Sequence, residues 1–191
     1  MKGKGMVTAV LALLTAVPAF AAGPREYSAD MAMRSAEGTM NGKIYVSGQL
    51  MRYEMGPAIT ITRLDRQVSY VLMPEQKMYM QQPMDPSAGA RAGVEPEGDV
   101  TREPLGPETF DGQSVEKVKV TSSDANGTTT VYQWLDGDSF PVKVEAEDGS
   151  WSVEYRNKQV GSQPADLFEV PSDYQAFAMP DLGQIMASAT Q

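Results

Sequence analysis

The side chains that could do chemistry in this chain are methionines, carboxylates and a few arginines, because the 191 residues include no His and no Cys. Without His the chain lacks the commonest general base, the Ser–His nucleophile pair and the usual zinc ligands. Without Cys it lacks thiolate nucleophiles and disulfide bonds. Most hydrolase and metalloenzyme functions are therefore excluded, and we expect no enzymatic activity and no cofactor.

Carboxylates offer one remaining route to catalysis. Glu145, Glu147 and Glu154 fall on neighbouring predicted strands, and glycoside hydrolysis needs only two carboxyl groups at a suitable separation. However, Glu145 and Glu147 alternate with apolar residues such as Val144, which places the acidic side chains on a solvated face. A solvated acidic surface is the interpretation that this pattern favours.

Two arginines could bind the charged headgroup of a ligand, since guanidinium suits carboxylate and phosphate groups. Arg52 lies two residues before Glu54, and Arg63 lies two residues before Asp65. Side chains at this spacing point to the same face of a strand. Surface ion pairs with these acids are therefore the simpler expectation for both arginines.

Methionine offers three further roles. Thioethers are soft ligands that select Cu(I), so the segments 31–33 and 78–80, each with two methionines, could bind cuprous ion. Methionine is also flexible and polarisable, which suits a surface that accepts apolar ligands. Filling an ordinary core is the third role. Even spacing puts the members of each pair on one side of a strand: Met31 with Met33, Met51 with Met55, and Met78 with Met80.

The elements that must position these side chains are short strands with alternating apolar and polar residues. Turn pairs such as Ser47-Gly48 and Asp148-Gly149 separate them, which indicates antiparallel hairpins. The predicted strands are Glu26–Arg34, Thr39–Val46, Gln49–Met55, Ala58–Leu64, Val68–Met73, Lys77–Gln81, Asp99–Leu105, Ser114–Thr121, Thr128–Leu135, Ser139–Glu147 and Ser150–Val160.

Eleven strands exceed what an open twisted sheet holds without curling or splitting. The fold class is therefore mainly β, with one highly curved antiparallel sheet that forms an unclosed barrel of about eleven strands. Helix is scarce: residues 164–168 suit a single turn, and 182–186 have helical spacing. The proline-rich loop 82–98 and the C-terminal segment are the expected covers of the concave face. Because these covers are small, we expect a lined concavity.

The first 21 residues have the form of a secretory signal peptide. Lys2 and Lys4 precede an apolar stretch, and cleavage is expected after Ala21. Residues 22–191 then form a single domain in the periplasm, with no transmembrane segment in the mature chain and no Cys for a lipid anchor. The net charge of −9 argues against nucleic acid as a partner.

Short motifs resemble a known superfamily. Residues 42–46, 51–54 and 71–79 resemble the central hairpins of bacterial periplasmic outer-membrane lipoprotein-carrier-like proteins, and residues 166–171 resemble their closing motif. The stretch 134–151 is most similar to an uncharacterised group of exported bacterial proteins within or near that superfamily. The resemblance implies an unclosed β-barrel with a hydrophobic cavity for acyl chains. The carriers' N-terminal helix has no counterpart here, and the loop at Ser47-Gly48 lacks their functional Arg.

The predicted function is to bind a hydrophobic ligand in the concave sheet. The ligand would be a lipid, an acyl chain or a lipidated protein, and the role would be the handling of outer-membrane lipids or lipoproteins. One alternative is an envelope interaction or sensing module with a filled core and a transient protein partner, and Cu(I) binding is another. The predicted ligand-binding residues are Met31, Met33, Met51, Tyr53, Met55, Ile61, Tyr70, Met78, Met80, Trp134, Val144, Trp151 and Phe168.

Overall fold

Twelve strands in one sheet make up most of the structure, a computed structural model that describes residues 25–84, 99–124 and 127–177. The signal-peptide prediction and the predicted helical segment 182–186 lie outside these residues, as does most of the proline-rich loop. The strands are β1 (Glu26–Ser35), β2 (Gly38–Ser47), β3 (Leu50–Met55), β4 (Ala58–Arg63), β5 (Val68–Met73), β6 (Met78–Pro83), β7 (Asp99–Phe110), β8 (Gln113–Asp124), β9 (Gly127–Leu135), β10 (Pro141–Ala146), β11 (Trp151–Val160) and β12 (Gln175–Ala176).

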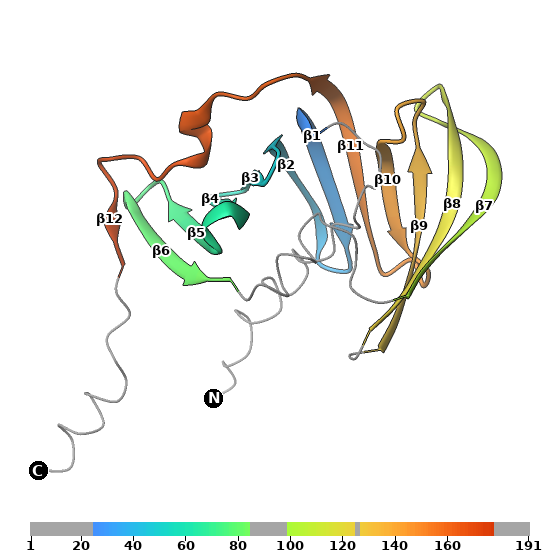
Figure 1. The fold of residues 1–191 in the computed structure, drawn as a ribbon, viewed down its shortest axis with the longest axis horizontal. Coiled ribbons are helices and arrows are strands. Elements are labelled where there is room, and N and C mark those ends of the chain that lie inside the picture. Colours follow the sequence, from blue (N-terminus) through green and yellow to red (C-terminus); the bar gives the residue numbers. More distant parts are fainter. Residues whose placement is uncertain (1–24, 85–98, 125–126, 178–191) are drawn as a thin grey trace, which may run out of the picture.

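The sheet is strongly curved and does not close (Figure 1). Its strand order is β12-β6-β5-β4-β3-β2-β1-β11-β10-β9-β8-β7, so two meanders are joined where β1 pairs with β11. Within the described residues the helical segments are the single turns η2 (Leu64–Arg66) and η3 (Ala165–Phe168). None of the described helices is long and apolar enough to cross a membrane.

The predicted fold class is confirmed. Each of the eleven predicted strands is present and pairs antiparallel with the others beside it. Short polar turns account for the pairings within each meander, whereas β1 and β11 pair across a long sequence separation. The structure adds β12, a two-residue strand parallel to β6. It also extends β7 to Phe110, through a bulge between Pro104 and Gly106. Prolines are compatible with β7 because it is an edge strand.

Strand register divides the side chains between two faces. Residues paired across antiparallel strands point to the same face, so Met31, Gly42 and Met55 share a face. We call this the inner face, since it lines the concave side of the sheet. The opposite side is the outer face, which carries Arg52 and Ile61, a directly paired couple on β3 and β4.

The main core lies on the inner face and consists of two clusters that Trp151 connects. The larger cluster spans β1, β2, β3 and β11, and Phe140 from the β9–β10 turn packs into it. The smaller one spans β8, β9 and β10 and is made of valines. The larger cluster contains Tyr27, Ala29, Met31, Ile44, Val46, Met51, Tyr53, Phe140, Val153 and Tyr155.

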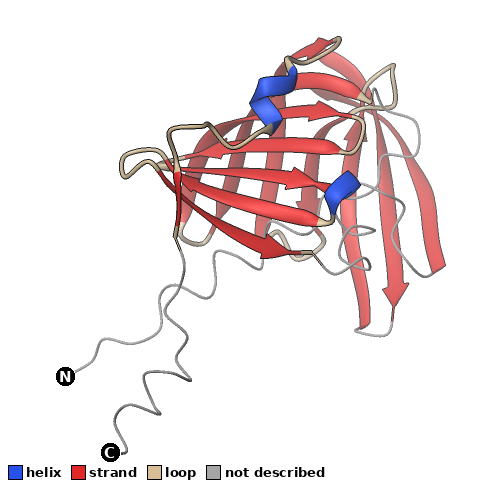
Figure 2. Cartoon of the chain, turned by 60° about the vertical axis from the view of Figure 1, so that its left-hand side comes forward, coloured by secondary structure: helices blue, strands red, loops and turns tan. Residues whose placement is uncertain are grey.

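The C-terminal segment 161–177 covers the outer face over β3 to β6. Phe168 of η3 is fully buried against Ile61 and Leu72, which point outward. Figure 2 shows η3, the longer blue helix, on the outer side of the front strands. The expectation that this segment covers the concave face was therefore wrong. Most outer positions of β4 and β5 carry large apolar side chains, such as Ile61 and Leu72, and these side chains need a cover of their own.

Candidate ligand-binding face

Every methionine in the strands points to the inner face. The register pairs Met33 with Met40, Val46 with Met51, Met73 with Met78 and Val71 with Met80, and these pairs belong to one continuous face. The outer positions of the same strands carry charged residues on β1 to β3, and Leu72 with the aromatic pair Tyr70 and Tyr79 on β5 and β6. The eight inner methionines are Met31, Met33, Met40, Met51, Met55, Met73, Met78 and Met80. The inner face is therefore the thioether-rich surface of the molecule.

The methionines differ in how far they are buried. Met31 and Met51 are only 4% and 6% exposed and belong to the larger core cluster. Met40, near the β1–β2 hairpin, is 43% exposed. Met33, Met55, Met73, Met78 and Met80 are half-buried. The half-buried methionines can still contact a ligand, whereas the buried Met31 and Met51 pack beneath the surface that a ligand would touch.

Gly42 lies among these methionines and leaves room for one of them, since it has no side chain. It lies opposite Met31 on one side and Met55 on the other. A Cβ at this position would lie 2.2 Å from the backbone oxygen of Glu54 and 2.9 Å from Met55 Cγ. The side chain of Met55 therefore lies over Gly42, and β2 and β3 approach each other closely at this point.

Aromatic rings close one end of the inner face. The Phe140 ring packs edge to face on Tyr27 at 5.0 Å and on Tyr155 at 5.7 Å between ring centroids. The Tyr53 hydroxyl contacts Met51 Sδ at 3.7 Å. Burial raises the pKa of Tyr27, Tyr53 and Tyr155 far above the usual range, so the three hydroxyls are neutral. The rings make the inner surface apolar at this end, and the Lys158 ammonium, paired with Asp136, lies 4.9 Å from the Phe140 ring centroid.

Register brings most of the predicted ligand-binding residues together. Nine of them lie on the inner face: Met31, Met33, Met51, Tyr53, Met55, Met78, Met80, Val144 and Trp151. The other four lie on the outer face or pack against it: Ile61, Tyr70, Trp134 and Phe168. These four cannot line the same concavity as the nine.

The two-residue turn Gly56-Pro57 explains the misplaced residues of β4 and β5. It pairs Met55 with Ala58, so Ala58, Thr60 and Thr62 face inward. Ile61 consequently points outward and pairs with Tyr70. This parity could have been read from the turn length, which the sequence shows directly.

Trp134 is held on the outer face by charged neighbours. Its indole Nε1 donates a hydrogen bond of 2.7 Å to Glu108 Oε2, and this bond lowers the pKa of Glu108. The ammonium groups of Lys117 and Lys143 lie 4.7 Å and 4.4 Å from its ring centroid. Cation–π contacts on both neighbouring strands thus replace the predicted contact with a ligand.

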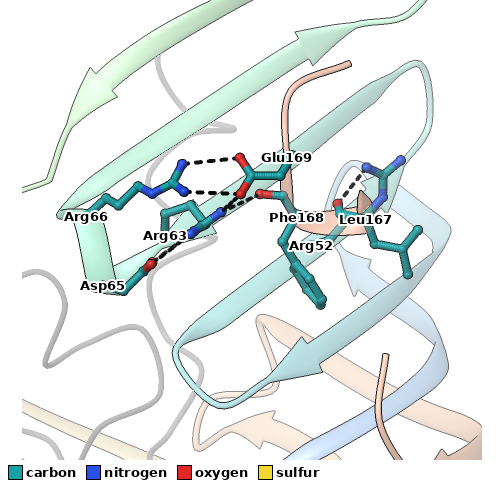
Figure 3. A network of polar contacts seen from close by, with 7 residues as sticks. All are labelled: Arg52, Arg63, Asp65, Arg66, Leu167, Phe168 and Glu169. Carbon is teal, nitrogen blue, oxygen red and sulfur yellow. Dashed lines mark hydrogen bonds and ion pairs between the residues drawn. The ribbon is translucent and has the colours of Figure 1, made fainter. Parts of the chain in front are cut away.

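Arg52 pairs with Glu54 and Arg63 pairs with Asp65, as expected. Both arginines also bind the C-terminal segment (Figure 3). Arg63 forms a two-fold hydrogen bond with Asp65, at 2.8 and 2.9 Å, and donates to Phe168 O at 3.2 Å. Arg52 donates to Leu167 O at 3.0 Å. Arg63 also pairs with Glu169, and these contacts hold the pKa of Asp65 and Glu169 below the usual range.

The other predicted chemistry is not assembled by the fold. Glu145, Glu147 and Glu154 are ion-paired with Lys143, Lys119 and Arg156, respectively. The methionine segments 31–33 and 78–80 lie on β1 and β6, with four strands between them. At about 4.8 Å per strand they are about 24 Å apart along the sheet, too far to bind one copper ion together. The part of the chain that the structure describes has no group of three acidic, His or Cys side chains that could hold a metal ion.

Comparison with known families decides the placement of the chain. A family model described as a domain of unknown function, DUF4412, matches residues 28–138, which span β1 to β9. The chain belongs to the DUF4412 family. This agrees with the predicted place of the sequence in an uncharacterised group. No curated protein matches the chain.

Solved structures similar to this DUF4412 protein include members of the predicted carrier superfamily. A LolA-superfamily protein from Nitrosomonas europaea is 15% identical, with 85% of this chain and 98% of that chain covered and a TM-score of 0.37. Lipoprotein LppX from Mycobacterium tuberculosis is 17% identical, with 78% of this chain and 91% of that chain covered and a TM-score of 0.38. LprF from Mycobacterium bovis is 11% identical, with 78% of this chain and 90% of that chain covered and a TM-score of 0.42. At these identities the likeness does not extend to ligands.

Proposed function

We propose that this protein is a non-enzymatic, exported binding protein that holds a hydrophobic ligand against its inner face. The ligand is a lipid, an acyl chain or the lipid part of a lipidated protein. The observation that carries this proposal is the position of all eight strand methionines on the inner face, five of them half-buried. Flexible thioether side chains adapt to fluid apolar chains better than branched ones do.

The location that fits this function is the periplasm, with a role in handling outer-membrane lipids or lipoproteins. The basic and apolar composition of residues 1–21 supports export. The acidic net charge of −9 disfavours adsorption to anionic lipid headgroups. A carrier of lipid needs this property, since it must leave the membrane surface after loading.

Affinity in such a site comes from burial of hydrocarbon, at about 0.8 kcal/mol per CH₂. Binding is therefore expected to change little between low and high salt. Mass spectrometry of organic extracts from the purified protein identifies any ligand that copurifies. Displacement of a fluorescent fatty acid then measures affinity in solution.

Variants of half-buried methionines provide the sharper test. Met33→Gln combined with Met55→Gln keeps side-chain length but places amides in the inner face. We expect affinity for the fluorescent fatty acid to fall by at least about tenfold. Arg34→Gln, on the exposed outer side of β1, is the matched control and leaves affinity unchanged. A protein that copurifies empty and does not compete for the probe contradicts the proposal.

A second candidate function is an interaction or sensing module whose concavity is a packed core. The nearly complete burial of Met31, Met51 and Tyr53 among aromatic rings favours it. In that case the Met33 and Met55 variants lower stability and alter no ligand binding. Pull-down from envelope extracts with purified protein would then identify the partner.

A further inference from the structure

Gln133 is a polar side chain within the valine cluster of the inner face. On β9 it lies directly opposite Val118 of β8 and Val144 of β10. Val131 and Leu135, two residues away on the same strand, share its face. The side chain is only 4% exposed. An aliphatic residue would satisfy the local pattern, and such a departure is typical of a functional position.

The amide nitrogen of the Gln133 side chain is also unsatisfied. Its Nε2 is buried and has no hydrogen-bond partner, and within the described residues it is the one buried side-chain nitrogen or oxygen in this state. A buried donor without an acceptor is destabilising, so folded proteins rarely retain one without a reason. A ligand that brings an acceptor to this point would supply the missing bond.

The side chains around Gln133 favour a neutral hydrogen-bond acceptor over a charged one. The nearest basic residues of the flanking strands point outward: Lys117 and Lys143 contact the Trp134 ring, and Lys119, opposite Tyr132, pairs with Glu147. On the inner side, the neighbours of Gln133 are the aliphatic Val118, Val131 and Val144. A free carboxylate placed there would lose its hydration without meeting a positive charge. A carbonyl oxygen needs only the single hydrogen bond that Nε2 can donate.

Gln133 also lies within reach of the methionine-rich region. Trp151 packs against both inner clusters and so joins the valine cluster around Gln133 to the larger one. A chain lying along the methionines could therefore present its polar end to the valine cluster. The apolar and polar parts of an acylated molecule match this division.

We propose that Gln133 Nε2 donates a hydrogen bond to the carbonyl oxygen of an acyl ester or acyl amide. This inference rests on the proposed function and narrows it, since the ligand class becomes carbonyl-linked acyl lipids. An ether-linked lipid of equal length has the same hydrocarbon but lacks the carbonyl. Comparison of the two isolates the contribution of Gln133.

The test measures displacement of a fluorescent fatty acid by three lipids of equal chain length: a monoacylglycerol, its ether analogue and an N-acylethanolamine. The intact protein is expected to bind the ester or the amide about threefold to tenfold tighter than the ether. The order of ester and amide distinguishes glycerolipids from N-acylated molecules as the source. Gln133→Leu is expected to abolish the preference while retaining affinity for the ether.

Two controls separate the possible outcomes. Gln133→Leu should melt at the same temperature as the wild type or higher, because it removes an unpaired donor. Gln82→Leu makes the same change at a half-buried inner position of β6 and should keep the preference for carbonyl. Equal binding of ester and ether by the wild type overturns the role of Gln133 but not the proposed function. Failure to bind any of the three lipids overturns both.

Discussion

At the scale of single residues, the inner face depends on Gly42 as much as on the methionines around it. Any larger residue brings a Cβ against the backbone of β3, at 2.2 Å from Glu54 O. Because backbone cannot move aside as a flexible side chain can, Gly42→Ala is expected to lower the free energy of unfolding by about 1–3 kcal/mol. Urea denaturation followed by intrinsic fluorescence measures the change.

Gly137 is the matched control for this substitution. It lies in the turn before β10, and a Cβ built there meets no atom within 4 Å. Its φ is also outside the left-handed region, so Ala fits without strain. Gly137→Ala should therefore leave stability unchanged or raise it by about 0.4–1 kcal/mol. Equal losses from the two variants would show that close approach of β2 and β3 is not the cause.

At the scale of elements, η3 and β12 act as one outer strap over β3 to β6. Phe168 is fully buried beneath it, and the strap ends with Gln175 N and Phe177 N donating to carbonyl oxygens of Lys77 and Tyr79. Phe168→Ala is expected to cost about 3–5 kcal/mol. Hydrogen exchange should show lost protection of the Gln175 and Phe177 amides. Asp166→Ala, exposed on the same turn, should leave both amides protected.

Acid should loosen the same strap. Hydrogen bonds from Arg63 lower the pKa of Glu169 and Asp65, and Lys77 lowers that of Asp173. A carboxyl group whose pKa is lower in the folded state stabilises the fold above its unfolded pKa, and this contribution is lost as pH falls through the folded value. The free energy of unfolding, measured in urea, should therefore decrease as pH falls below the usual carboxyl range.

Glu169→Gln tests the origin of this acid sensitivity. The variant keeps a hydrogen-bond acceptor for Arg63 but no longer titrates. Its stability should be lower than wild type at neutral pH, and the difference should shrink at acid pH. An unchanged pH profile would mean that the Arg63 and Glu169 pair does not fasten the strap.

The strands were predictable because their signal is local. Alternation along the chain marks each strand, and turn residues mark its ends, so all eleven predicted strands appear in the sheet. Assignment of faces also needs the register across each turn, so alternation alone groups Ile61 and Tyr70 with the methionines although they lie on the opposite face. Phe168 required knowledge of where the chain returns, which depends on the outward apolar residues of β4 and β5.

The sequence itself marks Gln133 as unusual. Val131 and Leu135 occupy the apolar positions of an alternating strand, and Gln133 interrupts them. The pattern alone could not show that the amide lacks a partner, because this depends on Val118 and Val144 from two other strands. Polar residues at apolar positions of a predicted strand therefore merit attention as candidate sites.

At the scale of the whole molecule, an unclosed sheet must keep its edges from pairing with other chains. Within the described residues β7 pairs with β8 alone, so the backbone groups along the other edge of this twelve-residue strand have no strand partner. Pro104 and Pro107 lie on this strand with a bulge at Gly106 between them. Prolines lack the N–H that an added strand would use, and a bulge twists the edge away.

If Pro104 and Pro107 keep β7 from pairing with other chains, their replacement should promote self-association. Replacing both prolines, Pro104→Thr with Pro107→Thr, restores two N–H groups and strand-favouring side chains at the edge. Sedimentation velocity should show concentration-dependent association of the variant beyond that of the wild type. Thr101→Val on the same strand raises β propensity but adds no donor, so it should sediment like the wild type. Association of Thr101→Val to the same extent would trace the effect to propensity rather than to the missing N–H groups. An unclosed sheet depends on this distinction, because its free edge must stay unpaired at the concentrations at which the protein works.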